Sequence, residues 1–419
     1  MKKIYIYADW ICTKRSLDAN KVYNYFSKNN NLLVDKPIDA DIIITFTCAS
    51  SKEMADRSFK KIIEFQKYDA ELIVAGCLPA IETKKLSEHF NGRIIITKNL
   101  DQLDSLFPEN KIKFKDIPDE NMFFPNYDGY SIIGILKKYA GEIKYIKNIY
   151  FRIKKHILKN LFDEKSLIYA ELTGKTNYYV RISWGCLGNC SYCAIKKAIG
   201  SHVSKPLDQC IKEFKKGLEK GYKNIIIAGD DVGAYGLDIG TDITKLLDEI
   251  TKIPGDYNIT IQTLHPQWVV RYINELEEIL KRQKITHLAI LIQSANKRIL
   301  NLMNRYSDTD KMRATFLRLK NLYPNLMVHT HCLLGFPSET KEEFKETLDF
   351  IAEVGFVGFI FLFSLRPGTK ANDIEPKISE NEMIKRLKYA KRFLTKKGYN
   401  VICFPKIHFF IFDKKILPR

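Results

Sequence analysis

The stretch Trp184-Gly-Cys-Leu-Gly-Asn-Cys-Ser-Tyr-Cys193 places Cys186, Cys190 and Cys193 in a CxxxCxxC spacing on one short segment. Cysteine thiolates hold iron–sulfur clusters, and three of them can bind three irons of a [4Fe-4S] cluster. The fourth iron then has no protein ligand and is open to a small molecule. The alternative is a structural zinc site, but such sites usually pair CxxC with a second CxxC or with histidines, and neither lies nearby. The spacing therefore favours a cluster that takes part in chemistry.

The composition indicates an intracellular enzyme. The chain of 419 residues is 45% hydrophobic, which is enough for two or three domains with their own cores. Its nine cysteines are odd in number and spread along the chain, which argues against a disulfide framework and for a reducing compartment. The first apolar run ends at Asp9, too early for a signal peptide, and residues 354–365 are too short to span a bilayer. We predict a cytoplasmic protein without a membrane segment.

The net charge of +18 at pH 7 has two interpretations, a well-solvated surface or a partner that carries phosphates. The same alternatives arise for the basic segment 137–159, whose apolar residues recur at helical spacing. A basic amphipathic helix contacts nucleic acid or a membrane surface in some proteins. More often its apolar stripe packs on its own protein, and that interpretation is favoured for this segment.

Strand and helix patterns alternate in the first hundred residues. Short apolar strands are expected at residues 3–8, 41–46, 71–75 and 93–97, with helices at 17–27 and 52–67 between them. This alternation predicts a doubly wound parallel sheet, in which ligands bind beyond the carboxyl ends of the strands. Cys12, Cys48 and Cys77 each follow one of the first three strands. Three unrelated buried cysteines are the alternative, but their equivalent positions favour a second three-cysteine cluster.

The alternation resumes from residue 177. Strands are expected at residues 178–183, 224–228, 258–263, 287–293, 327–332 and 358–364. Six parallel βα units form a partial (β/α)6 TIM barrel, whose chemistry lies at the carboxyl ends of the strands. The CxxxCxxC segment follows the first of these strands. We therefore divide the chain into an N-terminal cluster domain (1–115), a basic linker (116–176), a barrel (177–375) and a C-terminal helix with a short β tail (376–419).

Four further runs follow strands of the predicted barrel. They are Ala228-Gly-Asp-Asp-Val-Gly-Ala-Tyr-Gly-Leu-Asp238, Gln293-Ser-Ala-Asn-Lys-Arg-Ile-Leu-Asn-Leu-Met-Asn-Arg305, Gly335-Phe-Pro-Ser-Glu-Thr340 and Ser364-Leu-Arg-Pro-Gly-Thr-Lys-Ala371. With Cys12, Cys48 and Cys77 upstream, this set resembles the radical S-adenosylmethionine (SAM) methylthiotransferases over residues 1 to about 395. Residues 229–242, Gln293-Ser-Ala and Gly185-Cys-Leu-Gly-Asn-Cys are most similar to the branch that acts on threonylcarbamoyl-adenosine beside the tRNA anticodon.

The resemblance implies two [4Fe-4S] clusters and two uses of SAM. A cluster on Cys186, Cys190 and Cys193 would reduce SAM to a 5′-deoxyadenosyl radical, which takes hydrogen from an unactivated C–H bond. An auxiliary cluster on Cys12, Cys48 and Cys77 would carry a sulfur atom that a second SAM methylates. The residues expected to contact SAM are Tyr192 along the adenine, Gly229, Asp230 and Asp231 at the amino group, Gln293 and Ser294 at the ribose, and Gly335 where backbone approaches the adenine.

The chain departs from the family pattern at three places. The family's asparagine shortly after the first cysteine is absent, and Cys12-Thr-Lys-Arg15-Ser stands there instead. Ile292 replaces a proline before the Gln-Ser pair. After a helix at residues 380–397, the remaining residues suffice for one strand pair, expected at 400–405 and 407–412, and not for the family's C-terminal TRAM barrel.

These features lead to methylthiolation of a tRNA adenosine next to the anticodon as the first prediction. A methylthiotransferase-like enzyme acting on a protein or a ribosomally made peptide is the second, because the TRAM barrel that grips substrate is not expected. A non-catalytic iron–sulfur or zinc module is a remote third. The chemistry also calls for a flavodoxin- or ferredoxin-type reductant and a sulfur donor as partners.

Overall fold

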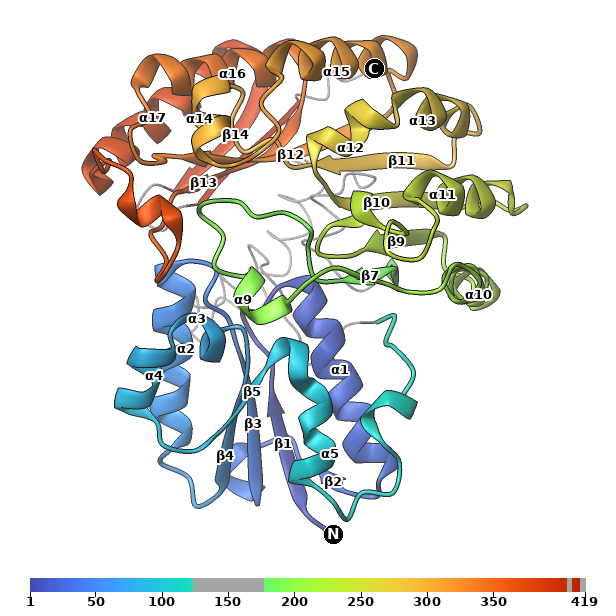
Figure 1. Ribbon diagram of the computed structural model, residues 1–419, viewed down its shortest axis with the longest axis vertical. Coiled ribbons are helices and arrows are strands. Elements are labelled where there is room, and N and C mark those ends of the chain that lie inside the picture. Colours follow the sequence, from blue (N-terminus) through green and yellow to red (C-terminus); the bar gives the residue numbers. More distant parts are fainter. Residues whose placement is uncertain (123, 125–176, 405–408, 415–419) are drawn as a thin grey trace, which may run out of the picture.

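The computed structural model describes residues 1–122, 124, 177–404 and 409–414. They form an N-terminal α/β domain and a partial barrel, and the carboxyl ends of the N-terminal strands point toward the barrel (Figure 1). The predicted fold class is confirmed. The basic segment 137–159 lies outside the described residues.

The N-terminal sheet has five parallel strands in the order β2-β1-β3-β4-β5. The strands are β1 (Lys3–Tyr7), β2 (Leu32–Leu33), β3 (Ile42–Thr47), β4 (Glu71–Gly76) and β5 (Arg93–Ile96). This order is that of a flavodoxin-like doubly wound sheet, with its switch point between β1 and β3. The four strands expected from the sequence are confirmed. The edge strand β2 was not expected, because two residues carry no periodic pattern.

Helices cover both faces of this sheet. They are α1 (Thr13–Lys28), α2 (Lys52–Phe65), α3 (Leu78–Ile81), α4 (Thr83–His89) and α5 (Leu103–Leu106), with 3₁₀ turns η1 (Pro37–Asp39), η2 (Thr97–Gln102) and η3 (Phe114–Asp116). Alternate residues of β3 divide between two cores, Ile42 and Ile44 facing α1 and Ile43 facing α2. Such two-sided burial explains why β3 is a continuous apolar run.

The barrel strands are parallel and follow one another in sequence order from β6 to β13, with an antiparallel hairpin at the far edge. They are β6 (Asn177–Arg181), β9 (Asn224–Ala228), β10 (Asn258–Leu264), β11 (Ile285–Ile290), β12 (Met327–Leu334) and β13 (Val357–Leu362), followed by β14 (Tyr399–Phe404) and β15 (Phe409–Lys414). The predicted six βα strands and the predicted C-terminal strand pair are thus confirmed. Strand β15 pairs with β13, so the hairpin extends the barrel sheet.

Nine helices lie between or beside these strands within the described residues. They are α9 (Lys196–Ile199), α10 (Leu207–Glu219), α11 (Ile243–Lys252), α12 (Pro266–Arg271), α13 (Ile273–Leu280), α14 (Lys297–Leu302), α15 (Thr309–Leu322), α16 (Lys341–Val354) and α17 (Glu380–Lys396), with turns η4 (Val232–Ala234) and η5 (Lys370–Asp373) and the small pair β7 (Ser183–Trp184) and β8 (Val203–Ser204). Local signals set their ends: Thr340 and Glu343 form a capping box at α16, and Gly355 ends it in a left-handed conformation. No helix among the described residues is long and apolar enough to cross a membrane.

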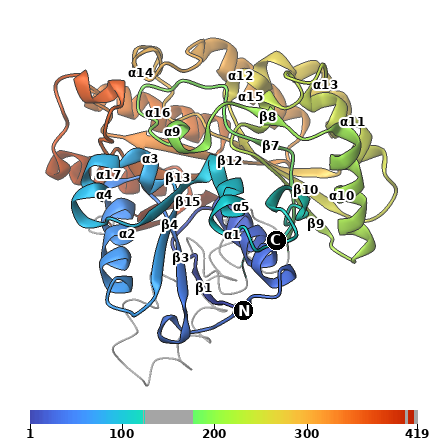
Figure 2. The ribbon, with the colours of Figure 1, turned by 60° about the horizontal axis from the view of Figure 1, so that its bottom comes forward.

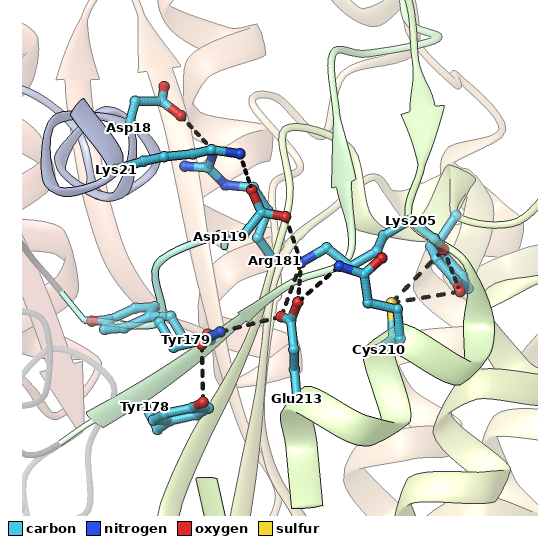
Figure 3. A network of polar contacts seen from close by, with 12 residues as sticks. Asp18, Lys21, Asp119, Tyr178, Tyr179, Arg181, Lys205, Cys210 and Glu213 are labelled. Carbon is cyan, nitrogen blue, oxygen red and sulfur yellow. Dashed lines mark hydrogen bonds and ion pairs between the residues drawn. The ribbon is translucent and has the colours of Figure 1, made fainter. Parts of the chain in front are cut away.

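Buried ion pairs connect the two domains (Figure 3). Lys205 is 2% exposed and lies 3.0 Å from Asp119 and 2.7 Å from Glu213 of α10. Asp119 is also paired with Lys21 of α1 at 3.0 Å. Because the Lys205–Asp119 pair forms only when the domains are together, the network favours one relative orientation. On another side of the interface, α9 lies against α3 (Figure 2).

Candidate functional site

The three N-terminal cysteines lie at the carboxyl edge of the sheet. Cys12 immediately precedes α1, Cys48 follows β3 and Cys77 follows β4. The Cys77 amide donates to the Thr47 carbonyl at 3.0 Å, which fixes the Cys77 loop against the end of β3. The Cys48 loop is held by Ser58, whose hydroxyl donates to the Cys48 carbonyl at 2.9 Å. Backbone bonds to the sheet and to α2 therefore position these thiols.

The structure brings these three thiols together. Burial raises the pKa of Cys77 to about 12, the positive charge of Arg15 opposes the rise, and Cys48 and Cys12 add to it. Thiols influence each other in this way only at short range. A sheet edge that carries three thiols, two of them buried, has the donor set of an iron–sulfur cluster. The residues present therefore fit the predicted auxiliary cluster, which stays a prediction.

The CxxxCxxC loop follows β6 and β7 and is shaped by backbone contacts. Gly185 has φ +69°, and its amide donates to Asp230 Oδ2 at 3.2 Å. The Gly188 amide donates to Cys186 Sγ at 3.2 Å, and a Cβ built at Gly188 would lie 3.2 Å from that sulfur and 3.9 Å from Cys190 Sγ. Cys193 is the most exposed of the three. An amide aimed at a sulfur suits a thiolate ligand of a cluster.

Three side chains from connections after other barrel strands contact this loop or lie beside it. Arg305 donates to Cys190 Sγ at 3.6 Å and to the Tyr192 hydroxyl at 3.4 Å. Cys186, Asp231 and His265 place their ligand atoms within 4.8 Å of one another. Burial, with help from Arg305, lowers the pKa of His265 to about 3, so its imidazole is neutral and able to bind a metal. The loop is thus surrounded by metal-compatible donors.

Hydrophobic packing couples the two cysteine sites. Ala194, the residue after Cys193, is 2% exposed and packs in the same core as Cys77 and Leu78. Ala198 of α9 is in that core as well. The buried guanidinium of Arg366 pairs with Glu82, which again connects barrel to N-terminal domain. The loop with Cys193 is therefore packed directly on the domain that holds Cys77.

Two of the residues predicted at the SAM amino group have partners inside the protein. Asp230 accepts from the Gly185 amide and pairs with Arg15 at 3.4 Å. Asp231 is fully buried and accepts from Trp268 Nε1 at 3.0 Å. Burial raises the pKa of Asp231 to about 6. At Gly229 a Cβ would lie 2.7 Å from the Ser183 hydroxyl, so this glycine permits close packing on β7.

The remaining predicted SAM contacts also follow strand ends. Gln293 has φ +66°, and its backbone continues the ladder to β12. Its side-chain Oε1 is buried and has no hydrogen-bond partner among the described residues. The Ser294 hydroxyl lies 3.2 Å from the Thr347 hydroxyl, and Tyr192 packs beside Phe336. At Gly335 a Cβ would lie 2.2 Å from the Met383 sulfur, so this glycine leaves room for the Met383 side chain of α17. Gln293 is thus the residue of this group with a free polar atom, and all seven SAM contacts stay predictions.

Sequence reasoning gave no role to Arg15, His265 or Arg305. His265 follows the third barrel strand, so the rule that placed the other runs at strand ends points to it as well. Arg305 lies inside a run already singled out, but its contact with a cluster-loop sulfur depends on the long connection after β11. Arg15 was noticed only as a departure. Its contacts with carboxylates of two domains are visible only in the tertiary structure.

Two family models match the chain. The Radical SAM superfamily matches residues 180–351, and the Uncharacterized protein family UPF0004 matches residues 5–97. A radical SAM domain implies a [4Fe-4S] cluster and SAM, and the loop with Cys186, Cys190 and Cys193 fits that cluster. Among solved structures, the radical SAM methyltransferase TsrM from Kitasatospora setae matches with a TM-score of 0.59 at 12% identity, over 88% of this chain and 77% of that one. This likeness supports the fold alone.

Curated relatives span most of the chain. A probable threonylcarbamoyladenosine tRNA methylthiotransferase of Methanocaldococcus jannaschii is 28% identical over 93% of this chain and 83% of its own length. The ribosomal protein uS12 methylthiotransferase RimO of Chlamydia felis is 28% identical over 90% and 75%. The threonylcarbamoyladenosine tRNA methylthiotransferase MtaB of Thermotoga maritima is 35% identical over 54% and 53%. The chain thus combines a radical SAM domain with a UPF0004 domain, and over most of its length it is similar to methylthiotransferases named for a tRNA nucleoside or for a ribosomal protein.

Proposed function

We propose that this enzyme inserts a methylthio group into an unactivated C–H bond of a tRNA adenosine next to the anticodon. The observation that carries the proposal is the gathering of Cys12, Cys48 and Cys77 at a sheet edge that packs on the CxxxCxxC loop. Two cofactor sites that face each other allow one substrate carbon to reach both. Such proximity removes much of the entropic part of the activation barrier.

The two clusters and two SAM molecules supply the chemistry. When bound, they would use one electron from the reductant to cleave one SAM, and the resulting 5′-deoxyadenosyl radical would take the substrate hydrogen atom to give 5′-deoxyadenosine. The C–S bond would then form with a methylthiolate, whose sulfur comes from the donor and whose methyl comes from the second SAM, and the electron released would pass to the second cluster. The chain's own residues hold and shield these groups. Cys186, Cys190 and Cys193 would bind the cluster that cleaves SAM, and Arg305 and the Gly188 amide donate to their sulfurs. Cys12, Cys48 and Cys77 would bind the second cluster.

Three considerations support tRNA as the substrate. The net charge is +18, and basic residues are dense in segment 137–159. Positive charge of this size suits a phosphate-bearing partner. The relatives from Methanocaldococcus jannaschii and Thermotoga maritima are named for a tRNA nucleoside. We place the enzyme in the cytoplasm, with a flavodoxin- or ferredoxin-type reductant and a sulfur donor as partners.

A polypeptide substrate is the second candidate. It is favoured by relatives named for ribosomal protein uS12, at 28% and 27% identity. It is also favoured by the C-terminal hairpin, because β14 and β15 extend the barrel sheet and build no separate β-barrel among the described residues. The two substrates differ in how their binding responds to salt.

Binding of bulk tRNA at several salt concentrations separates the candidates. A protein that neutralises phosphates releases counterions, so its affinity for tRNA should fall steeply as salt rises. Mass spectrometry of nucleosides from a deletion strain should show loss of a methylthio-adenosine. A flat salt response together with unchanged methylthio-nucleosides would contradict tRNA and favour the polypeptide.

Iron counting tests the second cluster. Anaerobically reconstituted enzyme should hold about eight irons, because each [4Fe-4S] cluster contributes four. A variant with Ala at Cys12, Cys48 and Cys77 should hold half as much, still form 5′-deoxyadenosine, and make no methylthio product. Full product from that variant would show that sulfur does not pass through these cysteines.

A further inference from the structure

Arg15 is a buried cation placed between the two cysteine sites. It lies in the first turn of α1, three residues after Cys12, and is 3% exposed. Its Nε lies 3.0 Å from Asp18 Oδ2, and its Nη2 lies 3.4 Å from Asp230 Oδ2. Asp18 belongs to the N-terminal domain and Asp230 to the barrel. The guanidinium therefore joins the two domains at one point.

One edge of the Arg15 guanidinium has no hydrogen-bond acceptor. Nη1 is buried, and the part of the chain that the structure describes offers it no partner. A buried, unpaired donor on a charged group is costly, so native proteins usually supply an acceptor for it. Besides the carboxylates of Asp18 and Asp230, the thiols of Cys77 and Cys12 interact electrostatically with Arg15. The unpaired Nη1 is therefore part of a cation that lies beside the N-terminal cysteine site.

Both carboxylates beside Arg15 are shared with other donors. Asp18 is shared with a second arginine, because Arg181 Nη1 lies 2.5 Å from Asp18 Oδ1. Asp230 is shared as well, because its Oδ2 also accepts from the Gly185 amide beside Cys186. Cys193 interacts electrostatically with Asp230. A continuous series of contacts thus leads from the N-terminal thiols through Arg15 and Asp230 to the CxxxCxxC loop.

We infer that Arg15 holds anionic sulfur at the N-terminal three-cysteine site and, through Asp230, fixes that site relative to the CxxxCxxC loop. The inference rests on the proposed function, in which this site carries sulfur. The ligand class is a sulfur anion, such as hydrosulfide or a methylthiolate, which accepts the Nη1 hydrogen bond. A charge-assisted bond of this kind is about twice as strong as a neutral one.

The test uses full-length enzyme with Ala at Cys186, Cys190 and Cys193, which leaves the N-terminal site as the remaining three-cysteine set. After anaerobic reconstitution, the reduction potential of its cluster and the binding of sodium hydrosulfide are followed by electron paramagnetic resonance. Arg15→Gln should lower the potential, because a positive charge stabilises the reduced cluster. It should weaken hydrosulfide binding about tenfold or more, as expected for loss of a hydrogen bond from a charged group. Arg15→Lys should restore part of both.

Arg181→Gln is the matched control, since Arg181 is equally buried, shares Asp18 and is not among the groups that interact with Cys77. It should keep the parent potential and affinity. Equal hydrosulfide binding by Arg15→Gln and its parent overturns the inference, as does an Arg181→Gln shift as large as that of Arg15→Gln. If Arg15→Gln folds but takes up no iron, Arg15→Lys must restore iron uptake or the inference fails. A parent that builds no cluster at all overturns the proposed second cluster itself.

Discussion

The two cysteine sites reach similar donor sets by different structural routes. Cys12, Cys48 and Cys77 follow three strands of one sheet, and two of them are buried. Cys186, Cys190 and Cys193 lie on one irregular loop, and the last of them is exposed. The first site is thus positioned by the ends of three sheet strands, whereas the second depends on the contacts of a loop. A fixed sulfur-carrying site beside a more exposed SAM-binding site suits the proposed division of labour.

The same physical constraint appears at one cysteine of each site. Gly76 precedes Cys77 with φ +108°, and Gly185 precedes Cys186 with φ +69°. In both places a Cβ would overlap backbone, at 2.4 Å from the Thr47 carbonyl oxygen and 1.9 Å from the Ser201 carbonyl oxygen. Each glycine thus lets the chain approach a neighbouring backbone closely and turn a thiol into the site.

The largest effects are expected from cysteine substitutions, which should block different steps of the reaction at the two sites. Cys186→Ala should reduce 5′-deoxyadenosine formation by at least about a hundredfold, because even outer partners of metal ligands cost ten- to a hundredfold when removed. Cys77→Ala should leave SAM cleavage largely intact and abolish the methylthio product. Chromatography of 5′-deoxyadenosine and product from the same reaction measures both. Loss of SAM cleavage in Cys77→Ala would mean that the two sites are not independent.

How far the sequence predicts each site follows from this difference. The CxxxCxxC site can be predicted from spacing, since its three ligands lie within eight residues. The N-terminal site needed a topological rule, that parallel strands end at one edge; Cys48 and Cys77 follow the paired strands β3 and β4, and the three-cysteine site stays a prediction. Arg15 and Arg305 could not be predicted, because their partners are far away in sequence and depend on domain docking and on a long loop.

Lys205→Met should break the connection between the two regions. It would leave the half-buried Glu213 without its cation and Asp119 with Lys21 alone, and removing one partner of a buried pair costs up to about 3–5 kcal/mol in the free energy of unfolding. Thermal denaturation of the apo-protein measures the loss. Lys223→Met is the control, because its pair with Asp256 is exposed and should contribute little. Equal melting temperatures for the two variants would contradict a structural role for the buried network.

The same network predicts an acid dependence. Burial alone would raise the pKa of Asp119, but Lys205 and Lys21 outweigh it and hold the pKa below its usual value. A lowered pKa contributes stability above the unfolded-state value, about 3.9 for aspartate, and that contribution is lost as pH falls through the folded-state value. Lys205→Met should therefore lose less of its remaining stability than wild type between neutral pH and pH 3. A parallel decline in both proteins would contradict this assignment.

Substituting Gly76 and Gly185 should show whether the sheet site and the loop site depend on close backbone packing to the same extent. Gly76→Ala and Gly185→Ala each force a Cβ into backbone, and overpacking of this kind costs about 1–3 kcal/mol. We expect Gly76→Ala to lower the melting temperature, since β4 is central in its sheet, and Gly185→Ala mainly to lower iron uptake. Gly240→Ala, with φ +72° and no atom within 4 Å of its Cβ, shows the cost of backbone strain alone. If Gly76→Ala lowers the melting temperature no more than Gly240→Ala does, the steric argument is wrong.

The smallest effect concerns the helix that supports Cys48. Ser51 caps α2 by accepting from the Met54 amide at 3.3 Å, whereas α9, which follows Cys193, has no side-chain cap at its first turn. Ser51→Ala should therefore lower the free energy of unfolding by about 1 kcal/mol, the usual value for a lost N-cap. Ser87→Ala is the control, because its hydroxyl bonds a carbonyl inside α4 and caps nothing. If urea unfolding shows equal losses for both, the cap does not stabilise the Cys48 loop. If Ser51→Ala also slows SAM cleavage, the rigidity of the sheet-edge site extends to the CxxxCxxC loop, and the two sites respond as one unit.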